Sequence, residues 1–306
     1  MSPPDSHVLP AGSDSMLFKL PLTQRMMLLS ILAAIVTLVL KFGAWKLTGS
    51  VGLFSDAAES LVNLFAAVFG LLALRISALP PDSNHAFGHD KAEYFSAGLE
   101  GALILVAAGT IIYAAIARLI DPAPVAELGW GLTVSVVASA VNAGVALLML
   151  KVAKDKDSIV LEADAHHLLT DVWTSIGVVG GLLLLFVFPK AQWLDPVIAI
   201  LVALNVLRTA LDLIKRAADG LMDVALPPIE VELLEKVLQG TLPITAKIIQ
   251  LRTRKSGSRR FIVFNLLLPG EMSVQDSHDL CDVLEDAIHA EFKNSEINIH
   301  VEPLEA

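Results

Sequence analysis

Long apolar stretches alternate with short polar segments over the first two-thirds of the chain. Six of these stretches are long enough to cross a bilayer, which takes roughly 20 residues. We place them at about residues 25–48, 51–78, 94–120, 127–150, 161–188 and 192–214. Residues 1–18 are rich in Pro, Ser and Asp and predict a disordered tail. The pattern therefore predicts an all-α six-helix transmembrane domain over residues 19–215.

The pattern changes near Asp223, and residues 216–306 carry both helix and strand signals. Apolar residues at helical spacing predict two amphipathic helices, in PPIEVELLEKVLQGT and from Ser277 to Phe292. Two apolar stretches around Gly257 predict a hairpin, and SEINIHVEP predicts a last strand. The order α-β-β-α-β predicts a small α+β domain of the metallochaperone type, which we assign to the cytoplasm.

Composition agrees with a membrane protein and narrows its partners. The chain is 55% hydrophobic and only 18% charged, and its mean hydropathy is +0.66. The net charge of −10 comes largely from acidic residues after position 216. A nucleic-acid binder would be basic, so we expect a lipid bilayer and no nucleic acid as partner. Cys281 is the only cysteine, which excludes an internal disulfide and a Cys-based zinc site.

Basic residues in the short loops predict the orientation, because cytoplasmic loops carry an excess of Lys and Arg. The loops on one side hold Arg75, Lys91, Lys151, Lys154, Lys156, Lys215 and Arg216. The loops on the other side hold Lys46, Arg118 and Lys190. We therefore expect a multi-pass membrane protein with both termini in the cytoplasm, in the cytoplasmic membrane if the chain is bacterial.

Two pairs of polar residues lie inside the apolar stretches. Glu59 and Asn63 are four residues apart, and so are His167 and Asp171, so each pair projects from one helix face. One interpretation is that such residues serve only as hydrogen-bonding contacts between helices. A buried glutamate, however, must either stay protonated or meet a cation. Because imidazole and carboxylate suit Zn(II) and its first-row neighbours, we predict one four-ligand metal site.

Four other polar residues near these pairs have several readings. Asp56, one turn before Glu59, could be a further ligand, a proton acceptor or a charge at the mouth of the site. Asp164 is expected either to support the site without binding the metal or to lie at its cytoplasmic mouth. His166 is expected to pack between helices or to support the site, and not to be a ligand. Lys41 could snorkel toward an interface or pair with Asp56 or Asp195.

Two further groups carry histidine with carboxylate. Asp82, His85 and His89 follow the second apolar stretch at spacing i, i+3, i+7 and could hold one Zn(II) with a water in the fourth place. The alternative is a polar loop with incidental histidines. In the soluble domain, His300 and Glu302 alternate on one strand face, and only the fold could bring His278 near them.

At this point the residues resemble those of the cation diffusion facilitators, a family of divalent-metal/proton antiporters. The resemblance runs from about residue 25 to the C-terminus and rests on four motifs. They are TGSVGLFSDAAESLVN, NHAFGHDKAE, LEADAHHLLTDVWTS and LRTRKSG. The resemblance implies a six-span homodimer with a soluble cytoplasmic tail.

The resemblance also assigns roles to residues of this chain. It implies a transport site at Glu59, Asn63, His167 and Asp171, and a second metal site in the loop at Asp82, His85 and His89. The tail often holds a two-metal site, of which His278, His300 and Glu302 are present here. Lys91 and Asp223 match a charge pair that connects the membrane domain to the tail.

Two departures from the family pattern affect the metal. The pair Glu59 and Asn63 replaces a leading Asp or His followed by Asp, which removes one formal charge and leaves the metal preference open. In the tail, Ile249 and Asn265 stand where further histidines often lie. We therefore expect at most one metal in the tail.

These observations predict a secondary active transporter that exports a divalent transition metal from the cytoplasm in exchange for protons. Zinc is the expected substrate, with Fe, Mn, Co or Ni as alternatives, and no organic cofactor is implied. A membrane metalloenzyme is disfavoured because the chain has no HExxH motif and a four-ligand site is closed. The alternative is a non-transporting metal sensor or dimerisation partner of the same family.

Overall fold

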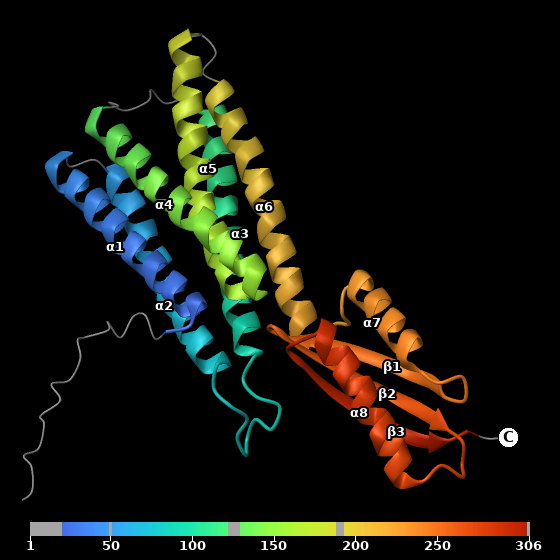
Figure 1. Cartoon of the computed structure of the whole chain (residues 1–306). Coiled ribbons are helices and arrows are strands. Elements are labelled where there is room, and N and C mark those ends of the chain that lie inside the picture. Colours follow the sequence, from blue (N-terminus) through green and yellow to red (C-terminus); the bar gives the residue numbers. More distant parts are fainter. Residues whose placement is uncertain (1–19, 49–50, 122–128, 188–192, 305–306) are drawn as a thin grey trace, which may run out of the picture.

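The computed structural model describes residues 20–48, 51–121, 129–187 and 193–304. Its first part contains six long helices that lie side by side (Figure 1). They are α1 (Leu22–Thr48), α2 (Val51–Ser77), α3 (Ala92–Ile120), α4 (Gly129–Lys156), α5 (Ile159–Val187) and α6 (Leu194–Leu221).

Four segments of the described residues are long and apolar enough to cross a membrane. They are Leu22–Gly43, Ala92–Ala117, Val136–Lys156 and Pro196–Leu221, within α1, α3, α4 and α6. The chain therefore has a mostly helical part with several candidate membrane spans. That α2 and α5 also cross the membrane stays a prediction.

Helix α5 lies at the centre of the helical part. Its residues enter one apolar cluster with α1, α2 and α4, and a second with α3 and α6. Alanines such as Ala146, Ala165 and Ala163 are fully buried at these contacts, and small residues let neighbouring helices approach closely. Polar residues on α5 are thereby surrounded by the other helices.

A small three-stranded sheet with two helices follows α6. Its elements are α7 (Pro228–Thr241), β1 (Lys247–Ser256), β2 (Arg259–Leu268), α8 (Val274–Glu291) and β3 (Ser295–Pro303). The sheet order is β1-β2-β3, with β1 antiparallel and β3 parallel to β2. The order of elements is the predicted α-β-β-α-β.

Both helices of this domain cover the same face of the sheet. Leu234 of α7 and Leu284 of α8 enter one core with Ile262 and Phe264 of β2. Because side chains alternate along a strand, Val263 and Asn265 lie on the opposite face. Ser273 caps α8 by accepting a hydrogen bond from the Asp276 backbone N–H at 3.1 Å.

The sheet domain meets the helical part at one end of α3 and α6 (Figure 1). The Gly257 backbone N–H, in the β1–β2 turn, donates to the Tyr94 hydroxyl at 3.1 Å. Gly257 has a φ of 57°, a region that glycine adopts without strain. Asp90 and Arg259 add an ion pair at 3.5 Å. Hydrogen bonds and charge pairs therefore connect the two parts.

Candidate metal sites

Asn63 of α2 lies between the two predicted ligands of α5. Its amide Oδ1 is 2.6 Å from His167 Nε2, and its Nδ2 donates to Asp171 Oδ2 at 2.8 Å. The three residues are 6%, 8% and 7% exposed. Helical spacing places His167 and Asp171 on one face of α5, and the α2–α5 contact places Asn63 opposite them. The structure therefore brings together three of the four residues predicted for this site.

The hydrogen bond to Asn63 determines how His167 is protonated. An amide oxygen only accepts hydrogen bonds, so His167 Nε2 carries the hydrogen in this arrangement. The buried Nδ1 has no hydrogen-bond partner among the described residues. A neutral imidazole can move its hydrogen to Nδ1 and release Nε2 as a ligand. His167 can thus bind a metal through Nε2 without carrying a charge.

The fourth predicted ligand, Glu59, belongs to α2, one turn before Asn63. The side chains of Glu59, Asp56 and Asp195 lie outside the described part of the structure. Lys41 is buried on α1.

Asn142 of α4 is a member of this cluster that the sequence reasoning missed. Its Nδ2 donates to Asp171 Oδ2 at 3.1 Å, and the residue is buried. The Asp171 carboxylate thus accepts amide hydrogens from two helices at the same oxygen. The sequence signal for this role was weak. Asn142 is the one amide side chain in the apolar stretch 127–150, and such a residue equally fits a hydrogen bond between helices.

The neighbours of His167 on α5 have separate surroundings. Asp164 is buried and faces Ser30 of α1. His166 is half-buried and its Nε2 is 3.9 Å from Glu162 Oε1. Glu162 in turn accepts two hydrogen bonds, of 2.5 and 2.7 Å, from Arg216 of α6.

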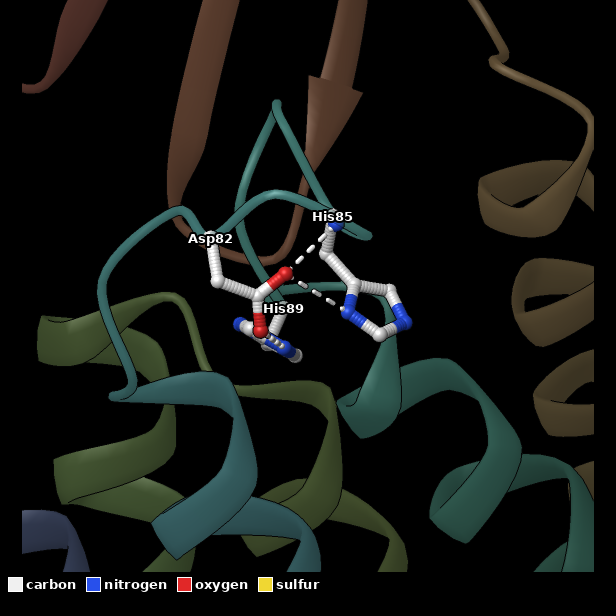
Figure 2. Close-up of side chains that lie close together, drawn as sticks. All are labelled: Asp82, His85 and His89. Atoms are coloured by element: carbon white, nitrogen blue, oxygen red, sulfur yellow. Dashed lines mark hydrogen bonds and ion pairs between the residues drawn. The ribbon is translucent and has the colours of Figure 1, made fainter.

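The loop between α2 and α3 holds a second cluster, formed by Asp82, His85 and His89 (Figure 2). Asp82 Oδ1 is 3.2 Å from His85 Nδ1, and Asp82 Oδ2 is 3.4 Å from His89 Nε2. One potential ligand atom from each residue lies within 4.8 Å of the others. Within the described ranges this is the one group of three or more His, Cys, Asp or Glu with that geometry.

Backbone hydrogen bonds shape this loop cluster. The N–H groups of Asn84 and His85 donate to Asp82 Oδ1 at 2.8 and 2.7 Å. The hydrogen bond from the His85 backbone is the main reason that the pKa of the Asp82 carboxyl lies below its usual value. Asp82 is therefore ionised and oriented before any metal arrives. Its exposure makes the cluster accessible from solvent.

The same loop touches the sheet domain. The Phe87 ring meets the Phe261 ring edge-on at 6.3 Å. The Arg254 guanidinium lies 3.8 Å from the Phe261 ring centre and 5.5 Å from that of Phe87. Such cation–π contacts are worth on the order of 1 kcal/mol each. They hold the loop against the turn end of the sheet.

The three predicted metal ligands of the sheet domain do not form one cluster within the chain. His300 Nε2 is 3.5 Å from Glu302 Oε1, and Asn265 donates to the same oxygen at 2.6 Å. His278 lies on α8 and contacts Asp282 at 3.3 Å. Because α8 covers the Ile297 and Ile299 face of β3, His300 and Glu302 point to the other face.

Lys91 and Asp223 lie in contact at the junction of the two parts. Lys91 Nζ is 3.0 Å from Asp223 Oδ1, and Arg254 donates to the same oxygen at 2.9 Å. Partial burial raises the pKa of Asp223, but the hydrogen bonds and charges of Lys91 and Arg254 outweigh it and lower the pKa overall. Asp223 thus connects the start of α3 to strand β1 as an ionised carboxylate.

Two family models match the chain. The cation efflux transmembrane domain matches residues 27–222, and the cytoplasmic domain of cation efflux proteins matches residues 226–304. The second model, ZT_dimer, indicates dimerisation.

Curated proteins match over nearly the whole chain. The "uncharacterized transporter sll1263" of Synechocystis sp. is 46% identical over 90% of this chain and 89% of its own length. The cation-efflux pump FieF of Escherichia coli K12 is 31% identical over 87% of this chain and 88% of its own length. Among solved structures, the metal-bound C-terminal domain of the CzcD transporter from Thermotoga maritima is 27% identical. That match covers 26% of this chain and 98% of the other, with a TM-score of 0.24.

Two comparisons lead to the same family. They are the family model that covers residues 27–222 and the pump FieF, which is 31% identical to this chain. Members of this family are multi-pass membrane transporters and not enzymes. The chain belongs to the cation efflux proteins, the cation diffusion facilitator family.

Proposed function

We propose that this protein is a homodimeric antiporter that exports a divalent transition metal, zinc in the first place, in exchange for protons. The observation that carries the proposal is the buried cluster of Asn63, His167 and Asp171, joined at 2.6 and 2.8 Å between α2 and α5. An imidazole nitrogen with carboxylate and amide oxygens is a donor set that suits Zn(II) and its neighbours. Glu59, one turn before Asn63, completes the proposed four-ligand site.

Proton exchange follows from the chemistry of these ligands. A metal binds the neutral imidazole of His167 and the ionised carboxylate of Asp171, so protons and metal compete for the same atoms. If the site faces the cytoplasm and the outside in turn, protons entering from outside displace the metal there. Rocking of the helices that carry the site would provide this alternation.

We propose the following organisation for the transporter. Residues 19–215 form six membrane spans, residues 216–306 form the cytoplasmic domain, and both termini are cytoplasmic. An even number of spans returns the chain to the side on which it began, and the basic loops identify that side as the cytoplasm. Lys91 and Asp223 connect the two domains, and the matched cytoplasmic domain supports a dimer.

The loop and the tail are proposed as accessory sites. Asp82, His85 and His89 would bind one metal at the cytoplasmic surface, because their ligand atoms already lie close together. In the tail, His300 and Glu302 would bind a metal only with ligands from elsewhere, such as His278 of a second copy. The loop site therefore has the stronger structural support.

The test of this function is metal-dependent proton flux in proteoliposomes that contain only this protein. Adding Zn(II) on one side should change the internal pH, and a panel of Zn, Mn, Fe, Co and Ni should rank the substrates. The absence of flux with every metal would refute transport. It would leave the metal sensor or dimerisation partner as the function.

Replacing Asn142 by alanine should weaken zinc transport by roughly 10-fold to 100-fold, the effect typical of losing a residue that orients a metal ligand. The variant removes one of the two amide hydrogen bonds to Asp171 Oδ2. Initial rates of zinc uptake over a range of zinc concentrations measure the effect. Asn205→Ala, at an exposed position of α6, is the control and should behave like the wild type.

The double variant His85→Ala, His89→Ala should bind one zinc fewer per chain than the wild type in equilibrium dialysis. Asp82 alone cannot replace the two imidazole ligands. His289→Ala on α8 should leave the zinc count unchanged, since His289 contacts Ser295 and belongs to no ligand group. An unchanged count in the double variant would remove the loop site.

A further inference from the structure

We propose that Glu100 on α3 binds a proton in the resting transporter and gives it up when a metal enters the neighbouring site. This inference rests on the proposed metal/proton exchange and adds a proton-binding residue that lies outside the metal site. Its basis is a group of buried oxygen atoms that comes from three helices, α1, α3 and α5.

Glu100 lies inside the helical part, and the described residues offer no partner for its charge. Its side chain is 0% exposed, and neither carboxyl oxygen has a hydrogen-bond partner among the described residues. An isolated ionised carboxylate in an apolar environment is very unfavourable, and such groups take up a proton instead. Glu100 at this depth is therefore a neutral carboxylic acid unless a cation approaches.

Other buried oxygen atoms lie on α3 itself and on α5 and α1. Asp164 of α5 faces Glu100 and is 2% exposed, with Oδ2 unpartnered within the described residues. The hydroxyl of Ser30 on α1 faces Asp164. The hydroxyl of Ser96, one turn before Glu100, is also buried. The polar side-chain atoms of this group are all oxygens, whereas the proposed metal site at His167 combines nitrogen and oxygen atoms.

Among the described residues of the helices packed against α3, none brings a positive charge to Glu100. Helix α2 presents Gly70, where an added Cβ would come within 3.4 Å of Glu100 Oε1. Helix α5 presents Asp164, the one titratable group of the described residues that acts on Glu100. Helix α6 meets α3 at the neighbouring Gly101, where its residues Ala210 and Ile214 are apolar. Two facing carboxyl groups without a cation cannot both be ionised, so the pair retains at least one proton.

The proton site lies close to the proposed metal site. Asp164 precedes His167 by three residues on α5, which is about 4.5 Å along the helix axis. A dication bound by His167 and Asp171 favours the ionised form of nearby carboxyl groups. Metal arrival should therefore expel a proton from the Glu100–Asp164 pair, and metal departure should restore it. No covalent bond other than the carboxyl O–H is broken or formed.

The test measures protons released when Zn(II) binds to the full-length dimer in detergent, using a pH indicator in weakly buffered solution. Glu100→Gln keeps the size of the side chain but cannot ionise. It should release about one proton fewer per zinc than the wild type at neutral pH. Glu100→Asp keeps the carboxyl group and should restore much of the release. Equal release by wild type and Glu100→Gln would overturn the proposal.

Infrared difference spectra on zinc addition provide a second readout that does not depend on a variant folding. Wild type labelled with ¹³C-glutamate should lose a protonated-carboxyl band that the label shifts, and labelled Glu59→Gln should still lose it, which separates Glu100 from the proposed ligand Glu59. If no labelled band is lost, Glu100 does not release a proton; if the band responds to Na⁺ and not to zinc, the site binds sodium and the proposal is wrong. Zinc affinity and uptake by the wild type are measured in parallel, so a failure of the transport function would appear separately.

Discussion

Replacing Asp171 by alanine should abolish zinc transport, with initial rates in proteoliposomes reduced by roughly 100-fold or more. The expectation exceeds the 10-fold to 100-fold loss typical of removing a residue that only orients a ligand. Asp171 supplies the negative charge of the described cluster and accepts hydrogen bonds from Asn63 and Asn142. Without the Asp171 carboxylate, the described cluster would offer a dication two amides and an imidazole, and Glu59 would be the one carboxylate left in the proposed four-ligand site.

The variant should still form the folded dimer. Without the Asp171 carboxylate, the amides of Asn63 and Asn142 can form hydrogen bonds with each other or with water. Size-exclusion chromatography checks this point. Asp212→Ala on α6 is the matched control, because Asp212 is exposed and forms a long ion pair of 3.9 Å with Arg216. Transport by Asp171→Ala at the wild-type rate would remove this residue, and the site built around it, from the account.

Replacing Gly220 by alanine should destabilise the protein by about 1–3 kcal/mol or more, the usual range for overpacking. Gly220 lies in the last turn of α6, and an added Cβ would overlap the Tyr94 ring. Tyr94 also accepts the hydrogen bond from the Gly257 N–H, so moving its ring disturbs the contact with the sheet domain. A lower midpoint of thermal unfolding measures the loss.

Gly144→Ala is the control for this prediction. Gly144 lies within α4 with nothing within 4 Å of an added Cβ, so alanine should leave the unfolding midpoint unchanged or raise it. If Gly220→Ala unfolds at the same temperature as Gly144→Ala, the close contact between α6 and Tyr94 does not limit stability.

Local sequence patterns predicted the elements and part of the site. The apolar stretches and the α-β-β-α-β order depend on residue spacing within each element, which the sequence displays directly. The placement of His167 and Asp171 on one face follows from helical periodicity. The two i, i+4 pairs predicted that Asn63 shares one metal site with His167 and Asp171, and the resemblance implied the same site. The structure places Asn63 Oδ1 2.6 Å from His167 Nε2.

The remaining features depend on which helices become neighbours. Asn142 is the one amide and Glu100 the one carboxylic acid within 94–120 and 129–150, and spacing within α4 or α3 does not tell which helix they face. The same reason separates His278 from His300. Strand alternation predicts that His300 and Glu302 share one face of the last strand. Only the packing of α8 against Ile297 and Ile299 decides that α8, which carries His278, covers the opposite face.

Uphill zinc accumulation driven by an imposed pH gradient tests the central claim most directly. Proteoliposomes with an acidic lumen and equal zinc on both sides should concentrate zinc inside, as protons leave through the protein in exchange. A protonophore should abolish the accumulation, and Asp171→Ala should show none. Zinc that only equilibrates across the membrane, whatever the pH gradient, would contradict exchange with protons.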